Sequence, residues 1–303
     1  MLGMISRFES IFQEYNLNYT APNVIQTLSE QELKLLLPEH DGWIIGDDPA
    51  TREVFEAGKK GKLKAAIKWG IGTDNIDFQA CRDFDIQIDN TPNIFGAEVA
   101  DIALGYVIGL ARHTFEIDRA VREGFWPKPP GISLKDKTVA VIGYGDIGKS
   151  LAKRLAACDM KIIIYDPYLK DFKAGINEDI ADWPERILEA DFIVTTCSLN
   201  ETSKHMLNKD IFSKVKSGVR IVNVGRGPII NQLDLEFALN QGVVHSAALD
   251  VFEDEPLPIT SALHGHPRCI FGSHNASNTI DAVERASILS INKLIKFLNN
   301  SIS

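Results

Sequence analysis

The chain has 303 residues, of which 45% are hydrophobic and 24% are charged. This length allows two domains with a sizeable core, and the composition is ordinary for a globular protein in water. The formal net charge of −9 at pH 7 argues against nucleic acid or an anionic membrane as the main partner. An anionic substrate would therefore need a local basic pocket.

The sequence carries no pattern typical of secretion, membrane insertion or metal binding. The N-terminus lacks a basic region followed by a long apolar core, and no segment approaches about eighteen uninterrupted apolar residues. We therefore expect a cytoplasmic protein with no membrane partner. The four cysteines, Cys81, Cys158, Cys197 and Cys269, lie far apart, which predicts neither a disulfide framework nor a metal cluster.

Short apolar strand candidates alternate with helical stretches along the chain. In chain order, strands are expected at 43–45, 63–69, 86–88, 139–142, 162–165, 192–196, 221–224, 246–249 and 269–272. Such alternation predicts parallel sheets with right-handed crossovers, and hence the α/β class.

Two helices are predicted with more detail. Residues 97–111 are apolar almost all round, which predicts a helix buried in a core or in a subunit interface. Residues 281–299 carry a broad apolar stripe, and we expect this last helix to return to the first domain of the chain.

The segment 139–148 reads Val-Ala-Val-Ile-Gly-Tyr-Gly-Asp-Ile-Gly, a β-branched run followed by a G-x-G-x-x-G spacing and an amphipathic helix. The first glycine allows a tight strand-to-helix reversal, the second lets a pyrophosphate approach the backbone, and the third lets helix and strand pack closely. The helix N-terminus offers N–H groups to the phosphates. The residues expected to bind the cofactor here are Gly143, Gly145, Asp146, Ile147 and Gly148.

The next strand candidate ends in Asp166, eighteen residues after Gly148. A carboxylate at this place accepts hydrogen bonds from the ribose hydroxyls and repels a 2′-phosphate, and Pro167 and Tyr168 bring no arginine that would favour NADP. The pattern therefore favours NAD, with a solvent-exposed aspartate in a turn before proline as the alternative.

Three polar side chains lie at or just beyond further strand candidates. They are Arg226 between two glycines, Glu255 in an acidic segment, and His274. Taken singly, each is typical of a surface arginine, a solvated acidic loop or a loop histidine. Because the carboxyl ends of parallel strands meet at one edge of a sheet, the three together, downstream of a nucleotide-binding turn, predict a single reactive crevice.

Over nearly its whole length the sequence resembles the D-2-hydroxyacid dehydrogenase family. The resemblance rests on Gly-Ile-Gly-Thr-Asp-Asn-Ile-Asp at 70–77, Asn-Thr-Pro at 90–92, Val-Ala-Asp at 99–101, the glycine turn, and the segments 223–227, 249–256 and 274–277. It implies two doubly wound parallel-sheet domains: a Rossmann NAD-binding domain at 96–277, inserted in a flavodoxin-like substrate domain at 1–95 and 278–303. It also implies a homodimer formed through the NAD-binding domains. The family usually opens with a strand, and by this resemblance we expect the first strand of the substrate domain to be missing here.

The resemblance also assigns roles to single residues. Arg226 would bind the substrate carboxylate and carbonyl, Glu255 would hold and charge the imidazole, and His274 would be the acid/base. The remaining assignments are backbone N–H groups of Ile71 and Gly72 for the carboxylate, and Cys197, Val224, Gly225 and Asp250 for the nicotinamide side.

The chemistry of reducing a 2-oxoacid agrees with these roles. Negative charge develops on the carbonyl oxygen as hydride arrives, so the site needs a proton donor and a fixed cation. Arginine suits a planar carboxylate because it forms two parallel charge-assisted hydrogen bonds. A nearby carboxylate favours the imidazolium form and fixes the histidine ring.

The substrate is expected to be a small anionic 2-hydroxy or 2-oxo acid. Lys68 and Lys128 could bind a phosphate, as in 3-phosphoglycerate, although an exposed lysine is usually solvated surface. Glyoxylate, hydroxypyruvate or glycerate is the alternative. A different class of function is an NAD-sensing scaffold that binds protein partners, against which the presence of Arg226, Glu255 and His274 argues.

Overall fold

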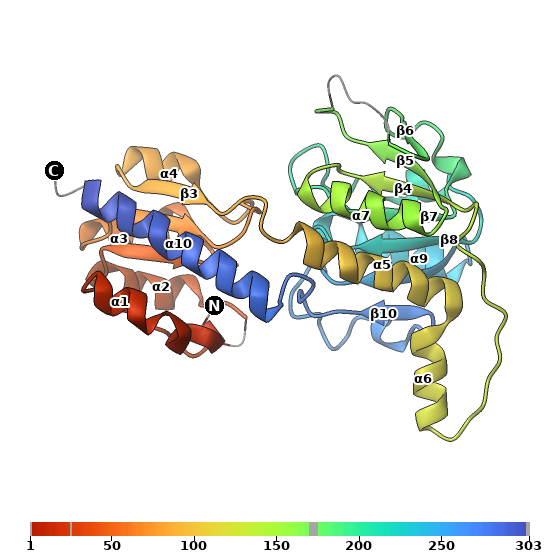
Figure 1. Ribbon diagram of the computed structural model, residues 1–303, viewed down its shortest axis with the longest axis horizontal. Coiled ribbons are helices and arrows are strands. Elements are labelled where there is room, and N and C mark those ends of the chain that lie inside the picture. The colour runs from red at the N-terminus through yellow and green to blue at the C-terminus, as the bar shows by residue number, and fades with distance from the viewer. Residues whose placement is uncertain (1, 25, 170–174, 301–303) are drawn as a thin grey trace. The chain divides into compact units, whose positions relative to one another are not determined.

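The computed structural model describes residues 2–24, 26–169 and 175–300 (Figure 1). By their internal contacts the residues form two compact units, Met1–Ile94 with Asn278–Ser303, and Phe95–Ser277. Within the described residues, no helix combines the length and apolar content that crossing a membrane requires. The α/β class is confirmed, because every strand pair in both sheets is parallel.

The smaller unit contains a three-stranded sheet in the order β1-β2-β3. The strands are β1 (Gly42–Ile45), β2 (Ala65–Lys68) and β3 (Gln87–Asn90). The helices, with η for 3₁₀ helices, are η1 (Leu2–Phe8), α1 (Glu9–Glu14), α2 (Glu30–Leu36), η2 (Leu37–Glu39), α3 (Arg52–Lys60), α4 (Phe78–Asp83) and α10 (Ile280–Asn300). Residues 2–14 are helical, and no strand precedes β1 in the described part of the chain.

The last helix, α10, packs on the sheet of this smaller unit, as the apolar stripe predicts. It contacts β1, β2 and β3. Ile291 and Ile295 form a small core with Phe8 and Phe12 from the N-terminal helices. The first and last segments of the chain are therefore held together by apolar burial.

The larger unit contains a seven-stranded sheet in the order β10-β9-β8-β7-β4-β5-β6. The strands are β4 (Thr138–Ile142), β5 (Lys161–Tyr165), β6 (Glu178–Ile180), β7 (Phe192–Thr195), β8 (Val219–Asn223), β9 (Val244–Leu249) and β10 (Cys269–Phe271). The helices are α5 (Gly96–Arg112), α6 (Thr114–Arg122), α7 (Asp146–Ala157), η3 (Ile187–Glu189), α8 (Lys209–Phe212), η4 (Gly227–Ile229), α9 (Gln232–Asn240) and η5 (Ala262–Gly265).

This strand order is that of a Rossmann fold with one additional strand. Successive strands are added on one side of β4 up to β6, and from β7 onward on its other side, so the order of addition reverses between β4 and β7. Helices α5 and α7 lie side by side on one face of the sheet, and α9 lies on the other (Figure 1). Right-handed crossovers place helices on opposite faces on the two sides of such a reversal. The reversal opens a crevice at the carboxyl ends of the strands, where α/β proteins bind ligands.

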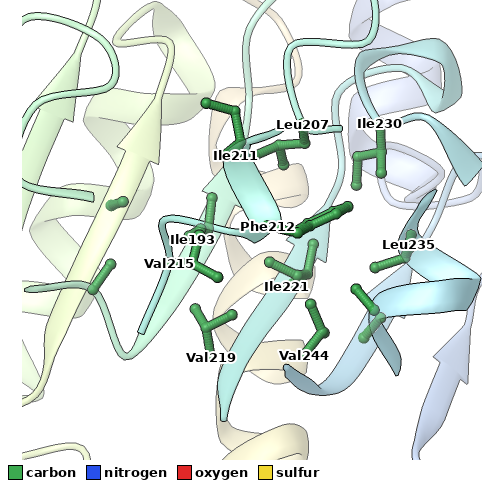
Figure 2. Packing of buried hydrophobic residues seen from close by; sticks show 14 of the residues in the cluster. Ile193, Leu207, Ile211, Phe212, Val215, Val219, Ile221, Ile230, Leu235 and Val244 are labelled. Atoms are coloured by element: carbon green, nitrogen blue, oxygen red, sulfur yellow. The ribbon is translucent and has the colours of Figure 1, made fainter. Parts of the chain in front are cut away.

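One apolar core of the larger unit lies between the sheet and helices α8 and α9. Figure 2 shows Ile193 and Ile221 from the sheet packed against Phe212 and Leu235 from these helices. Because the sheet is covered on both faces, its strands read as continuous apolar runs, and all residues of β7 and β8 are buried. The loops at the carboxyl edge are thus attached to a rigid support.

Candidate active site

The glycine turn after β4 is shaped by close packing at two positions and open at the third. Gly143 has a φ of +90°, and a Cβ there would lie 2.6 Å from Cys197 Cα. A Cβ at Gly148 would lie 2.1 Å from the Gly143 oxygen. At Gly145, by contrast, a Cβ would meet no described atom within 4 Å. The turn therefore leaves backbone accessible at its middle glycine.

Helix α7 begins directly after Gly145, and no side chain caps its first turn. The N–H groups at Asp146, Ile147 and Gly148 thus lie at the positive end of a twelve-residue helix dipole. Together with the open glycine, this arrangement fits a diphosphate group.

Asp166 is held against the same turn by two backbone hydrogen bonds. Its Oδ2 accepts from the Tyr144 N–H at 2.7 Å, and its Oδ1 accepts from the Tyr168 N–H at 2.9 Å. The Tyr144 hydroxyl donates to Glu178 Oε2 at 3.0 Å, and burial, together with that carboxylate, raises the pKa of Tyr144. The carboxylate of Asp166 is fixed where a ribose diol would follow the diphosphate, so these residues fit a dinucleotide.

Cys197 follows β7 and lies beside both glycine segments. Besides its contact with Gly143, its carbonyl oxygen would be 2.8 Å from a Cβ at Gly225. Burial raises the pKa of the Cys197 thiol to about 12, so the side chain is neutral. Val224 is buried next to Gly225. The structure thus brings together three of the four residues expected on the nicotinamide side.

Arg226 is positioned by the buried side chain of Asn223 at the end of β8. Asn223 Oδ1 accepts from Thr195 Oγ1 at 2.7 Å and from the Gly225 N–H at 3.0 Å, while its Nδ2 donates to the Arg226 carbonyl at 2.9 Å. The Arg226 guanidinium donates to the Gly225 carbonyl at 3.0 Å. One asparagine therefore fixes the backbone that presents the arginine.

Glu255 and His274 form a direct pair. His274 Nδ1 lies 2.7 Å from Glu255 Oε2, and Glu255 Oε1 accepts the Phe252 N–H at 2.9 Å. The side chains of His274 and Glu255 are 23% and 22% exposed, so the pair is sheltered yet reachable. Because Nδ1 faces the carboxylate, proton exchange between this ring and a ligand would take place at Nε2.

Asp250 has a role that the sequence analysis missed. Its side chain is 3% exposed and accepts from the Asn275 N–H at 3.3 Å, the Ala276 N–H at 2.9 Å and the Tyr106 hydroxyl at 3.4 Å. Burial, and then Asp250 itself, raises the pKa of Tyr106. The His274 N–H in turn donates to the Asp250 carbonyl at 2.7 Å. Asp250 therefore holds the loop that carries the histidine.

Comparisons with known proteins agree with this geometry. The family described as "D-isomer specific 2-hydroxyacid dehydrogenase, NAD binding domain" matches residues 104–276. The chain is 35% identical to hydroxypyruvate reductase of Thermotoga maritima over 276 residues, which cover 89% of each chain. It is also 35% identical to D-3-phosphoglycerate dehydrogenase 2, chloroplastic, of Arabidopsis thaliana, over 86% of this chain but 42% of that protein.

The chain belongs to the D-isomer specific 2-hydroxyacid dehydrogenase family. It is an NAD-dependent oxidoreductase that acts on the CH–OH group of donors. Among solved structures, the NAD-dependent formate dehydrogenase of Staphylococcus aureus in complex with NAD superimposes with a TM-score of 0.86 at 25% identity, over 97% of this chain and 88% of that one.

In the smaller unit of this dehydrogenase, the loop after β2 is held by residues of the Asn-Thr-Pro motif. Thr91 is buried and accepts the Gly70 N–H at 2.7 Å, and Asn90 Nδ2 donates to the Ile71 carbonyl at 3.3 Å. Ile71 is 51% exposed, so the loop with Ile71 and Gly72 lies at the surface of its unit. The motif therefore has a structural function in shaping this loop.

Lys68 of the dehydrogenase is buried, with 2% exposure. Its ammonium donates to the Gly46 carbonyl and lies 3.1 Å from Asp47 Oδ1. Asn75 Nδ2 also donates to the Gly46 carbonyl, at 3.2 Å. Lys68 thus connects β2 with the loop after β1, and this geometry disfavours the phosphate contact expected from the sequence.

The segment that follows Lys128 is anchored at the amino end of the large sheet, whereas Arg226 lies at the carboxyl end. That segment returns to the C-terminal end of α5, where the Ile132 N–H donates to the Ala111 carbonyl at 2.9 Å. That end of α5 meets the amino end of β8, since Arg220 Nε donates to the Leu110 carbonyl at 3.3 Å. This anchoring at Ile132 disfavours folding of the segment over the Arg226 site of the same chain.

Proposed function

We propose that the dehydrogenase interconverts a small, unphosphorylated 2-oxoacid and its D-2-hydroxy acid, with hydroxypyruvate or glyoxylate as the oxoacid. The contact of 2.7 Å between Glu255 and His274, at the sheet edge that also carries Arg226, supports the reaction. The proposal that the substrate carries no phosphate group rests on Lys68, because its ammonium contacts Gly46 and Asp47. The Thermotoga maritima hydroxypyruvate reductase, matched over 89% of each chain, points to the same substrate class.

In this proposal the residues divide the work as follows. Arg226 binds the substrate carboxylate through two parallel charge-assisted hydrogen bonds. Glu255 orients the imidazole and stabilises its charged form. His274 donates the proton on Nε2 to the developing alkoxide. NADH, when bound at the glycine turn, supplies the hydride that reaches the carbonyl carbon.

A second candidate is oxidation of 3-phosphoglycerate, favoured by the 35% identity to the Arabidopsis thaliana phosphoglycerate dehydrogenase. The chain spans 42% of that protein's length. Because the ammonium of Lys68 already contacts Gly46 and Asp47, this substrate would require a cation from elsewhere.

Initial rates of NADH oxidation with a panel of 2-oxoacids test the function. The panel contains glyoxylate, hydroxypyruvate, pyruvate and 3-phosphohydroxypyruvate. We expect kcat/KM for hydroxypyruvate to exceed that for its phosphorylated form by roughly tenfold or more. A bound phosphate would lose its hydration without gaining charge-assisted hydrogen bonds in return. The reverse order supports the second candidate. No turnover with any member contradicts the proposed reaction and leaves the NAD-sensing scaffold.

We further propose that Asp166 makes the enzyme prefer NADH to NADPH. Asp166→Ala should weaken NADH binding and narrow the ratio of the two kcat/KM values, because a repulsive charge and ribose hydrogen bonds are lost together. Asp166→Asn is the matched control for the turn, since an amide oxygen can still accept the Tyr144 N–H. Equal efficiency with both cofactors in the unmodified enzyme would refute the assignment.

We propose that the enzyme is a homodimer formed through the larger unit. In the single chain, large apolar side chains are exposed on α5, on α6 and on the segment after α6. They are Ile102, Ile108, Phe115, Val121, Phe125 and Trp126, with Phe125 at 65% and Trp126 at 78% exposure. An exposed group of this size is typical of a surface covered by another protein chain. Burial in a subunit interface is also one of the two outcomes that the all-round apolar sequence of α5 predicts, burial in a core being the other.

A cytoplasmic location remains our proposal for the enzyme. All four cysteines are free thiols in the structure. Unpaired cysteines are usual in a reducing compartment, where disulfides rarely persist.

A further inference from the structure

Three loops at the carboxyl edge of the large sheet meet at His205. They are residues 196–207 after β7, 224–231 after β8 and 250–256 after β9, and these strands are neighbours in the sheet. The His205 N–H donates to the Pro228 carbonyl at 2.7 Å. Its ring nitrogen Nε2 lies 2.7 Å from Glu253 Oε1. One residue of the first loop thus touches both of the others.

The first two loops are anchored in the core. The Leu207 N–H donates to the Ile229 carbonyl at 3.2 Å, and the Asn231 N–H donates to the Leu207 carbonyl at 2.9 Å. Leu207 and Ile230 are buried among the apolar residues of Figure 2. His205 and Pro228, at the ends of this pairing, therefore have fixed positions.

The third loop, which carries Glu255, lies directly against the second. A Cβ at Gly227 would come within 1.7 Å of the Phe252 carbonyl oxygen. Backbone contact keeps the two loops close, and Glu253 adds a side-chain contact to the first loop two residues before Glu255.

Two local features at this contact are energetically unfavourable: a backbone conformation and a buried carboxylate oxygen. His205 has a backbone φ of +51°, in the left-handed region that residues other than glycine adopt infrequently. Glu253 Oε1 is shielded from solvent and accepts no hydrogen bond from the described residues, which is unfavourable for a carboxylate oxygen. His205 Nε2 lies 2.7 Å from this oxygen, as a close polar contact rather than a hydrogen bond.

We propose that His205 and Glu253 are positioning residues for the oxoacid reductase reaction. The pair holds the third loop against the first two, so that Glu255 keeps its place on His274 while Arg226 keeps its place on the adjoining loop. Neither His205 nor Glu253 acts on substrate. The expected loss of kcat rests on the proposed function, whereas the role of the pair in holding the loops together does not.

The kinetic test compares His205→Ala and Glu253→Ala with the wild-type enzyme on the best oxoacid of the panel. We expect kcat to fall roughly tenfold in each, because small displacements of positioned groups slow catalysis strongly. The dissociation constant of NADH, from fluorescence titration, should change less than about twofold, because the glycine turn is untouched. Asp254→Ala is the matched control, since it removes the same charge from an exposed position of the same loop.

A double-mutant cycle and a conservative variant make the test specific. The double alanine variant should be no slower than either single variant, because both remove one interaction. His205→Gln keeps an N–H donor near Glu253 and should recover most of the lost kcat, which also guards against misfolding of the alanine variants. Additive losses, no recovery with glutamine, or an equal loss in Asp254→Ala would overturn the proposal.

Amide hydrogen exchange provides a measurement that does not depend on turnover. The Phe252 N–H, which donates to Glu255 Oε1, should exchange faster in both alanine variants and at the wild-type rate in Asp254→Ala. Unchanged protection of Phe252 would overturn the pairing even in an active enzyme. If the wild-type protein reduces no oxoacid, the proposed function fails, and faster exchange would still support the pair.

Discussion

His274 combines a strained backbone with a fixed ring. Its φ of +54° lies in the left-handed region, and it persists because the Asp250 carbonyl and the Glu255 carboxylate hold the residue from two sides. Strain of this kind is often found where a side chain must point into a reaction site. The geometry therefore agrees with a histidine whose Nε2 is directed to substrate.

His274→Ala should lower kcat by about 10² to 10⁴-fold, the usual contribution of general acid/base catalysis, while the affinity for NADH stays nearly the same. Steady-state rates and NADH fluorescence titration measure the two quantities. His264→Ala is the control, because His264 is an exposed histidine of the same unit. A His274→Ala enzyme that keeps half of the wild-type rate would exclude the proposed mechanism.

For single residues, the sequence predicts which residue types lie at the ends of strands, but not which atoms each side chain contacts. Arg226, Glu255 and His274 could be predicted because each follows a recognisable strand. The burial of Lys68 could not, since its acceptor at Gly46 lies 22 residues away on another loop. The same holds for Asp250, whose hydroxyl donor Tyr106 comes from a helix 144 residues earlier.

Among the elements, η4 begins at Gly227, where two loops are in backbone contact. Gly227→Ala should force the loops apart and lower both kcat and the free energy of unfolding, the latter by about 1 to 3 kcal/mol, which is typical of overpacking. Gly265→Ala is the control, because a Cβ there meets no described atom within 4 Å. Wild-type kcat and urea midpoint in Gly227→Ala would show that the loops separate without cost.

The start of β9 contains a histidine surrounded by positive charge. Burial, followed by Arg220, Arg268 and His113, lowers the pKa of His245 from 6.5 to about 4, while Glu116 acts in the opposite direction. As the pH falls below 6.5, the His245 imidazole becomes protonated in the unfolded chain, whereas in the folded chain it stays neutral until about pH 4. Folding stability should therefore decrease across this interval, by about 1 to 2 kcal/mol after allowance for solvent screening.

Urea denaturation at several pH values measures this loss, and His245→Gln should remove that part of it. Above pH 6.5 the imidazole is neutral in both states, so the pH slope of the variant should match the wild-type slope there. His264→Gln, the same substitution at an exposed position, is the matched control for the effect of the substitution itself. An identical profile for wild type and His245→Gln would contradict the assignment.

Strand prediction succeeded where strands are apolar and failed where one is polar. All nine expected strands are present, with bounds that differ by a few residues. The missed strand, β6, is Glu178–Ile180, in which two of three residues are acidic. As an edge strand that pairs with β5 alone, it has little apolar surface to bury, so no hydrophobic pattern marks it.

For the whole molecule, the exposed apolar residues predict self-association. Replacing Phe125 and Trp126 together by serine should raise the dimer dissociation constant by roughly tenfold or more, because large aromatic side chains dominate most interfaces. Sedimentation velocity over a concentration series measures this change. Tyr168→Ser is the control, since Tyr168 is an aromatic residue with 81% exposure elsewhere in the unit. A wild-type protein that sediments as a monomer at all concentrations would refute the dimer.

The position of α10 in the smaller unit also has a consequence for protein synthesis. Its partners β1, β2 and β3 leave the ribosome long before Ile280 does, and the entire larger unit is translated in between. The larger unit is continuous in sequence, so it can complete its own core while translation proceeds. The smaller unit must close a loop of nearly two hundred residues to gain its last helix. During translation the β1–β3 sheet therefore waits with an uncovered apolar face, and in the cell this is the surface that chaperones would have to protect.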